Sequence, residues 1–212
     1  MELVKKYFHN ADILKIEKLV KFSELIANYN SRVNLISRKD IDNIETNHIL
    51  HSLAIAKFIS FKNGSKILDI GTGGGFPGIP LAIFFPDSEF LLIDSIGKKI
   101  KIVQEMIEIL DLNNAKAINS RVEVLKIPKV NFIVTRAVAP LSKLYNWGKH
   151  LVNTDNFNDL KNGFILLKGG NLVEEKNEFY KNFNKKDLTE IDLRNYFDED
   201  FFDTKKLIYF KV

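Results

Sequence analysis

The sequence contains no cysteine among its 212 residues. Without thiols the protein cannot form disulfides, bind zinc through thiolates or hold an iron–sulfur cluster through cysteines. A covalent mechanism that begins with attack by a thiolate is excluded for the same reason. Any chemistry therefore has to come from other residue types.

Long apolar stretches are also missing. No run approaches the roughly 18 consecutive apolar residues that a membrane helix needs. The N-terminal residues MELVKKYFHNAD mix acids with lysines and lack the apolar segment of a signal peptide. We therefore expect a soluble, cytoplasmic protein without a membrane partner.

Neither sign of charge is in large excess, because 31 basic and 27 acidic side chains give a net charge of +4. The excess is uneven: residues 1–170 hold 23 Lys and Arg against 17 Asp and Glu, whereas residues 171–212 hold 8 against 10. A mildly basic body suits a polyanionic partner such as RNA. Lysines also solubilise a surface without any partner, so charge alone leaves both interpretations open.

Hydrophobic periodicity divides the chain into two parts. Helical spacing predicts helices over residues 13–30 and 41–61, and an Asn-Gly-Ser turn follows at 63–65. Short strands and helices then alternate. The predicted strands are 66–70, 89–94, 115–120, 131–138 and 163–170, the helices are 77–85, 98–110, 141–152 and 172–182, and the two closing strands are 186–193 and 204–212.

This alternation predicts an α/β, Rossmann-like fold with a doubly wound, mostly parallel seven-stranded sheet. The last two strands are expected to form an antiparallel hairpin at one edge. Residues 1–64 are predicted to form a small helical extension and residues 65–212 the Rossmann-like domain, together one compact unit. Ligands of such sheets lie outside the carboxyl ends of the strands.

The stretch DIGTGGGFPG, residues 69–78, joins the first predicted strand of the sheet to a helix. Its four glycines, at 71 and 73–75, let the backbone turn sharply and expose N–H groups. Asp94 ends the second strand 23 residues after Gly71, where a carboxylate can accept both hydroxyls of an adenosine ribose. Turn and acid together predict an adenosine-containing cofactor, with a turn that is glycine-rich for packing alone as the alternative.

Two features favour S-adenosylmethionine over NAD. A dinucleotide needs a third glycine for its pyrophosphate, but Phe76 and Pro77 fill that place. Asp69 also stands two residues before the first glycine, in the D-x-G-x-G order that is common in methyltransferases of this fold.

The sequence resembles the bacterial 16S rRNA (guanine-N-7) methyltransferase family, also called glucose-inhibited division protein B. The glycine block with its Phe-Pro-Gly and the DSIGKK block are the most specific parts of the resemblance. The matching blocks, in family order, are RVNLISR (32–38), HILHSLA (48–54), LDIGTGGGFPGIPLAI (68–83), LIDSIGKK (92–99), SRVEVL (120–125), VTRAVAPL (134–141) and LLKGG (166–170).

The resemblance implies a class I S-adenosylmethionine-dependent methyltransferase with a small N-terminal helical region. It further implies methyl transfer to N-7 of a guanine in the 530 loop of 16S rRNA, on free rRNA or the small ribosomal subunit, by a monomer. Two positions depart from the family: Val122 replaces a common alanine, and His51 replaces the aspartate of many members.

The predicted cofactor residues come from two sources. The turn and the acid by themselves indicate Gly71, Gly73 and Asp94, and the resemblance adds positions in the turn and after the third and fourth strands. The full predicted set is Gly71, Gly73, Phe76, Asp94, Val122, Glu123 and Arg136.

The predicted substrate side contains cations. Arg136 and Lys168 end the fourth and fifth strands and are expected to orient the guanine or to hold a phosphate. An ion pair from Arg136 to Asp69 or Glu123 is the structural alternative. For contacts with RNA we expect Arg32, Asn34, Arg38 and His48.

Two further patterns receive structural interpretations. His48 and His51 stand three residues apart, but no third ligand accompanies them, so we expect no metal site. Trp147 and the many phenylalanines are predicted to lie in the core.

Apart from the resemblance, the chemistry of guanine N-7 methylation agrees with the residue types that the sequence contains. Guanine N-7 has a free lone pair, so positioning and electrostatics suffice and no general base is expected. Methylation of pyrimidine carbon-5 would need the absent cysteine. A small-molecule methyltransferase of the same fold, a nicotinamide-dependent oxidoreductase and an RNA-binding factor without turnover remain as alternatives.

Overall fold

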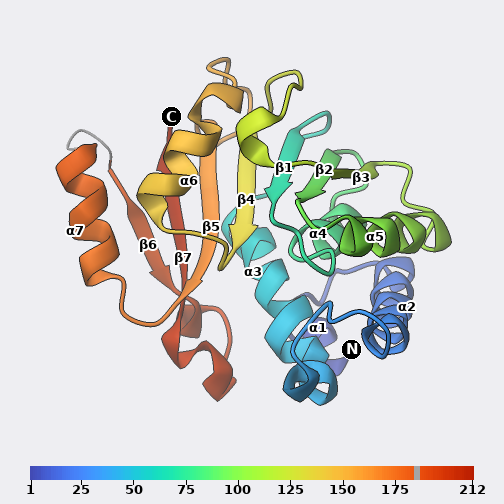
Figure 1. The fold of residues 1–212 in the computed structure, drawn as a ribbon. Coiled ribbons are helices and arrows are strands. Elements are labelled where there is room, and N and C mark those ends of the chain that lie inside the picture. Colours follow the sequence, from blue (N-terminus) through green and yellow to red (C-terminus); the bar gives the residue numbers. More distant parts are fainter. Residues whose placement is uncertain (184–186) are drawn as a thin grey trace.

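The computed structural model describes residues 1–183 and 187–212, and within them seven strands form one sheet (Figure 1). The strands are Lys66–Ile70 (β1), Glu89–Asp94 (β2), Ala115–Asn119 (β3), Phe132–Arg136 (β4), Gly163–Gly169 (β5), Thr189–Asp192 (β6) and Lys205–Lys211 (β7). Their order is β3-β2-β1-β4-β5-β7-β6. The strands β1 to β5 pair in parallel, and β7 is antiparallel to both of its neighbours.

The predicted doubly wound sheet with an antiparallel closing pair is therefore confirmed. β7 lies between β5 and β6, so the short strand β6 forms the edge of the sheet. Lys186, the first residue of the predicted strand 186–193, lies outside the described residues. The observed strand begins at Thr189.

The side chains of the sheet enter two separate hydrophobic clusters, one on each face. Along β4, Phe132 and Val134 belong to the first cluster, and Ile133 between them belongs to the second. This alternation is the two-residue period of a strand. Because helices cover both faces, the central strand β5 carries an unbroken, buried apolar run at residues 164–167.

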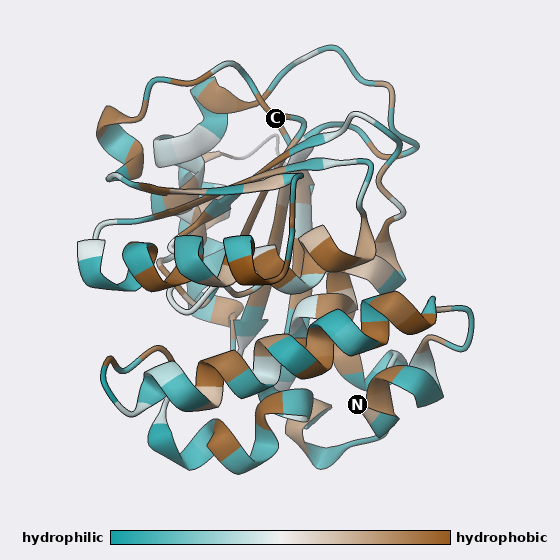
Figure 2. Cartoon of the chain, turned by 90° about the vertical axis from the view of Figure 1, so that its right-hand side faces the viewer, coloured by the Kyte–Doolittle hydropathy of each residue, from teal (hydrophilic) through white to brown (hydrophobic). Residues whose placement is uncertain are grey.

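Helices of the two faces come from different parts of the chain. The first cluster is covered by α2 (Ile13–Asn30), α3 (His51–Phe58), α4 (Gly78–Phe84) and α5 (Gly97–Ile109), and the second by α6 (Leu141–Gly148) and α7 (Val173–Asn182). Figure 2 shows hydrophobic residues along the interior strands and many hydrophilic ones on the helices nearest the viewer. Of the helices in the described residues, none combines the length and apolar character needed to cross a membrane.

The predicted helix 41–61 was wrong as one continuous element. The chain instead forms a 3₁₀ helix at Arg38–Asn43, a π-helical turn at Glu45–Leu50 and then α3. Single π-helical turns are frequent at functional sites. Here the turn carries Asn47 and His48, which both contact Arg136 at the end of β4.

The N-terminal segment shares the first hydrophobic cluster with the sheet. The short helix α1 (Glu2–Tyr7) and α2 both bury side chains in it. The Phe22 ring of α2 lies 5.0 Å from that of Phe76, in the glycine turn after β1. A division of the chain at residue 64 stays a prediction.

Candidate functional site

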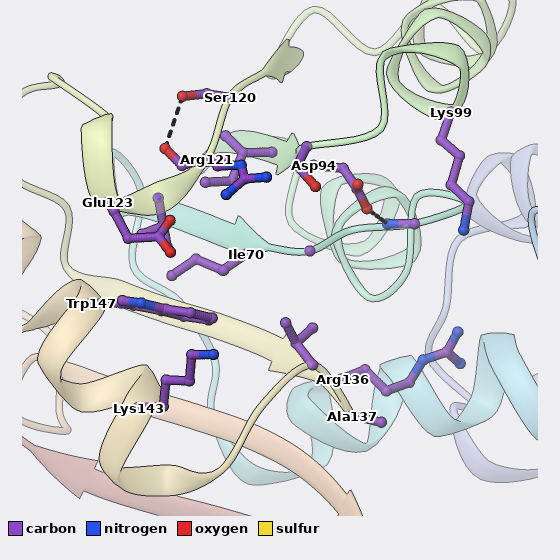
Figure 3. A pocket seen from close by; sticks show the side chains of 16 residues that line it. Ile70, Asp94, Lys99, Ser120, Arg121, Glu123, Arg136, Ala137, Lys143 and Trp147 are labelled. Carbon is purple, nitrogen blue, oxygen red and sulfur yellow. Dashed lines mark hydrogen bonds between the residues drawn. The ribbon is translucent and has the colours of Figure 1, made fainter.

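A cavity of about 500 Å³ opens at the carboxyl ends of the sheet strands (Figure 3). Its walls come from the segments that follow β1 to β4, together with α5 and α6. This is the edge at which open α/β sheets bind their ligands. The predicted cofactor residues that line the cavity are Gly71, Gly73, Asp94, Val122, Glu123 and Arg136.

Two glycines shape the wall after β1. Gly71 has φ +71°, and a Cβ there would come within 2.6 Å of the Val138 side chain on the loop after β4. Gly73 has φ +57°, and a Cβ there would meet nothing within 4 Å. Glycine is thus required at 71 for both its backbone conformation and the close approach of Val138, and at 73 for its backbone conformation. Without a side chain at Gly73, the backbone there is open to the cavity.

Asp94, at the end of β2, lies next to the glycine turn. One oxygen of its carboxylate accepts from the Gly73 N–H at 3.0 Å and the other from the Ile96 N–H at 2.9 Å. Its backbone carbonyl accepts from the Asn119 side chain at 2.8 Å. The sequence predicted the acid and the turn separately, and the structure joins them by a hydrogen bond.

The third wall of the cavity follows β3. Val122 is buried at the start of a 3₁₀ turn, Val122–Val124, and Glu123 beside it is exposed. Trp147 of α6 faces this turn across the cavity, and Lys143 lies near it (Figure 3). Trp147, predicted to lie in the core, is half-buried: it packs against the second hydrophobic cluster and also lines the cavity.

The Arg136 guanidinium points away from Trp147, toward the N-terminal segment (Figure 3). Its Nη2 lies 2.9 Å from Nδ1 of His48, and its Nη1 donates to the Asn47 carbonyl at 3.3 Å. Within the described residues it forms no ion pair with Asp69 or Glu123, so that alternative does not describe its contacts. Burial lowers the pKa of Arg136 to about 10, so the group remains a cation at neutral pH.

Phe76 lies behind the turn and not in the cavity wall. Its ring is 2% exposed, packs 5.1 Å from His48 and lies 4.8 Å beneath the Arg136 guanidinium. Burying this apolar ring stabilises the fold more than exposing it at the cavity rim would. Its predicted contact with the cofactor stays a prediction, and its observed role is to support Arg136.

His48 is buried as well, at 7% exposure. Burial, with the nearby Arg136 charge, lowers the pKa of His48 to about 4, so the ring is neutral at physiological pH. Its Nε2 lies 3.4 Å from the Asp40 carboxylate, which also accepts from the Asn47 side chain at 2.9 Å. The structure thus places His48 inside an Asp40–His48–Arg136 chain instead of on an RNA-facing surface.

His51, where the family pattern has aspartate, is 5% exposed and packs edge-on against the Phe201 and Phe202 rings. Burial holds the pKa of His51 well below its usual range, so it is also neutral. Among the residues that the structure describes, no group of three or more His, Cys, Asp or Glu side chains is arranged to hold a metal ion.

Lys168 does not line the cavity. Its ammonium is 2.6 Å from the Glu175 carboxylate of α7 and donates to the Ala139 carbonyl at 2.6 Å. The same Glu175 oxygen accepts from the Leu141 N–H at 2.7 Å. Lys168 therefore ties α7 to the loop between β4 and α6, a structural contact that the sequence did not indicate.

Similarity to known proteins identifies the family of this chain. The family model "GidB: rRNA small subunit methyltransferase G" matches residues 15–199. The chain belongs to this family. Proteins named ribosomal RNA small subunit methyltransferase G are similar over nearly the whole chain. The one from Christiangramia forsetii is 48% identical, covering 99% of this chain and 96% of that protein, and the one from Porphyromonas gingivalis is 45% identical, covering 98% and 92%.

Solved structures agree on the fold. A SAM-dependent methyltransferase from Aquifex aeolicus aligns with a TM-score of 0.59 at 16% identity, covering 84% of this chain and all of that one (100%). Fibrillarin from Aeropyrum pernix, in complex with S-adenosyl-L-methionine, aligns with a TM-score of 0.57 at 12% identity, covering 77% and 74%. The predicted family, enzyme class and class I methyltransferase fold of this GidB-family protein are therefore confirmed.

The remaining predicted RNA contacts lie beside the cavity. Arg32, Asn34 and Arg38 are exposed, and the loop that carries them packs on the glycine turn. A Cβ at Gly74 would lie 3.0 Å from Leu35 of this loop. The segment that carries the three side chains thus packs beside the glycine turn, and their contact with RNA stays a prediction.

Residue-by-residue reasoning missed several wall positions. Lys143, Trp147 and Val138 line the cavity from α6 and the loop before it. The helical period of 141–152 predicted α6 but not where the helix would end relative to the sheet. A half-buried tryptophan is recognisable only once its neighbours are known.

Replacing Lys168 with alanine is expected to lower the free energy of unfolding by about 2–3 kcal/mol, because it leaves Glu175 half-buried without its cation. Denaturant unfolding measures the loss. Lys66→Ala is the matched control: its partner Glu89 is 3.7 Å away and both side chains are exposed, so less than about 1 kcal/mol should be lost. Unchanged stability together with a large drop in turnover would instead show that Lys168 acts on the substrate, as the sequence predicted.

Proposed function

We propose that this protein methylates N-7 of a guanine in the 530 loop of 16S rRNA. The observation that carries the proposal is the convergence of the predicted cofactor residues on one cavity, in a chain that matches the family over residues 15–199. The acceptor is 16S rRNA or the small ribosomal subunit, in the cytoplasm, and the protein acts as a monomer. No metal and no membrane takes part.

The cofactor is S-adenosyl-L-methionine, and the residues of the cavity fit it. A volume of about 500 Å³ lies within the range of small-molecule sites. The open backbone at Gly73 suits the amino-acid end, and the Asp94 carboxylate suits the ribose hydroxyls. When bound, the cofactor supplies a methyl group on a sulfonium centre.

The protein's own task is to position the guanine for methyl transfer and to exclude water from the cavity. Guanine N-7 attacks through its lone pair, so no proton has to leave first and no general base is required. The bound cofactor would supply the methyl group to N-7, and the positive charge of its sulfonium would then reside on the guanine. Arg136 at the glycine end can donate to the guanine edge at O6, where recognition of guanine by arginine is most common.

Arg136→Lys is expected to lower kcat for rRNA methylation by about tenfold, while cofactor affinity changes by less than about threefold. Lysine keeps the charge but loses the planar stack on Phe76 and the paired contacts with Asn47 and His48. Single-turnover methylation and calorimetric titration separate the two effects. A large loss of cofactor affinity with unchanged kcat would assign Arg136 to the cofactor instead.

The proposed function is tested by mapping 7-methylguanosine in 16S rRNA by mass spectrometry, in cells with and without the gene. Loss of the modification in the 530 loop, and its restoration by the purified protein on small subunits, are the expected results. An unchanged modification map would contradict the proposal. Methylation at another guanine would keep the enzyme class and move the acceptor.

A further inference from the structure

The two contacts of Arg136 with the π-helical turn determine where His48 carries its proton. Nη1 of Arg136 donates to the Asn47 carbonyl, and Nη2 lies 2.9 Å from Nδ1 of His48. A guanidinium has N–H donors and no acceptor, so Nδ1 has to accept in this pair. Burial and the Arg136 charge lower the pKa of His48 to about 4, so the ring is neutral at pH 7. Its single proton therefore lies on Nε2.

The Asp40 carboxylate lies behind both groups that hold Arg136. Its Oδ1 accepts from the Asn47 side chain at 2.9 Å, and its Oδ2 lies 3.4 Å from Nε2 of His48. The second contact is long for a hydrogen bond, but Nε2 is buried and has no closer partner in the part of the chain that the structure describes. One carboxylate thus faces both Asn47 and His48, with one oxygen for each.

This arrangement requires an acid at position 40. Both groups that face Asp40 are donors, the Asn47 amide and the His48 Nε2–H, and an ionised carboxylate has acceptors only. An asparagine would offer one acceptor and one donor, so one of the two groups would meet an N–H. The negative charge also acts on Arg136, because Asp69 and Asp40 oppose the lowering of the Arg136 pKa by burial.

We propose that Asp40 is a positioning residue for Arg136. It holds Asn47 and the Nε2–H tautomer of His48, and these two groups hold the guanidinium in the direction that methyl transfer needs. The proposal rests on the proposed function, since it takes Arg136 as the group that orients the guanine. A guanidinium that is free to rotate is less often in the productive direction, so loss of Asp40 slows transfer without removing a group that touches the substrate.

Support of the fold alone is the competing role for Asp40. Its side chain is 34% exposed and belongs to the 3₁₀ helix Arg38–Asn43, so it adds little buried surface. A purely structural role predicts that Asp40→Asn lowers the midpoint of denaturant unfolding while kcat of the folded protein stays at the wild-type value. A positioning role predicts the opposite emphasis, with a loss in kcat that the change in stability does not explain.

Asp40→Asn is expected to lower kcat for rRNA methylation by about tenfold and to change the Kd of S-adenosyl-L-methionine by less than about threefold. Single-turnover methylation of small subunits and calorimetry measure the two. Asp42→Asn is the matched control: it removes the same charge from an exposed position of the same 3₁₀ helix and should leave kcat unchanged. An equal loss in both variants would indicate a general effect of charge and overturn the proposal.

A double-mutant cycle tests whether Asp40 acts through Arg136. In the Arg136→Lys protein the group to be positioned is already altered, so adding Asp40→Asn should lower kcat by less than about twofold further. The same tenfold loss in both backgrounds would show that the two residues act independently, and the positioning role would be wrong.

The tautomer of His48 gives a readout that needs no substrate. The chain has four histidines, and the ¹⁵N NMR signals of His48 are assigned by their loss in His48→Gln. At pH 7 the ring should be neutral with its proton on Nε2, and a proton on Nδ1 would contradict the proposal whatever the activity. Failure of the wild-type protein to methylate 16S rRNA would contradict the proposed function, whereas a wrong tautomer or an additive cycle in an active enzyme would contradict the positioning role alone.

Discussion

Gly71→Ala is expected to weaken S-adenosyl-L-methionine binding by at least about 100-fold. Two costs combine. A residue with a Cβ loses roughly 1–2 kcal/mol in the left-handed conformation that Gly71 adopts at φ +71°. The new Cβ would also press within 2.6 Å of Val138, which itself lines the cavity, so the wall has to move where the ligand lies. A 100-fold change corresponds to about 2.7 kcal/mol, and most of it is expected from the displaced wall, because the backbone strain is present with and without ligand.

Gly64→Ala is the matched control for this prediction. Gly64 has φ +80°, but a Cβ there meets nothing within 4 Å, and it lies in the turn before β1 and away from the cavity. Gly64→Ala should lose roughly 1–2 kcal/mol of unfolding free energy, as left-handed positions do, and Gly71→Ala at least as much because of the contact with Val138. Only Gly71→Ala should lose cofactor affinity in calorimetric titration. Normal binding by both would show that the ligand does not approach the turn.

Asp69→Asn is expected to remove a pH-dependent contribution of about 4 kcal/mol to the free energy of unfolding. This value follows from about 1.4 kcal/mol for each unit by which the pKa differs between the folded and unfolded states. Asp69 is fully buried at 0% exposure, and its carboxylate accepts from the Gly78 N–H at 2.9 Å. Burial raises the pKa of Asp69 from 3.8 to about 7, although the Gly78 N–H and the Arg136 charge act in the opposite direction.

The sign follows from proton binding. The folded protein holds a proton on Asp69 that the unfolded chain releases near pH 4, so this group favours folding most below that pH. The contribution is lost as the pH rises from about 4 to about 7. Wild-type protein should therefore lose stability relative to Asp69→Asn across this window, and the difference should level off above it.

Urea unfolding of both proteins between pH 4 and pH 8 measures the effect. Asparagine keeps an acceptor for the Gly78 N–H, and any fixed cost of its buried amide shifts the curve without changing its slope. Asp87→Asn removes a carboxylate from an exposed turn and should give a profile parallel to wild type. A constant difference between wild type and Asp69→Asn at every pH would show that Asp69 does not titrate within the window.

The N-terminal segment also holds Arg136 at the edge of the cavity. Arg136 is held by Asn47 and His48 from the π-helical turn, and by Phe76 from the glycine turn beneath it. Two separate segments thus fix one guanidinium. We therefore expect changes in the N-terminal segment near residues 40–48 to alter methyl transfer more than cofactor binding.

The sequence alone determined the architecture and the frame of the cavity. Strand and helix alternation predicted the sheet, because each element's hydrophobic period is a local property of the chain. The glycine turn and Asp94 predicted one rim of the site, since both stand at fixed places relative to a strand end. The family blocks supplied the acceptor, which no residue of the cavity specifies by itself.

The tertiary structure decided which side chains face the cavity and which face the core. Trp147 became a wall residue, Phe76 a support for Arg136, and Lys168 an anchor for α7. The partners of Arg136 lie 88 and 89 residues away in the sequence. Periodicity and spacing describe neighbours along the chain, whereas burial and hydrogen bonding at these positions depend on segments that only folding brings together.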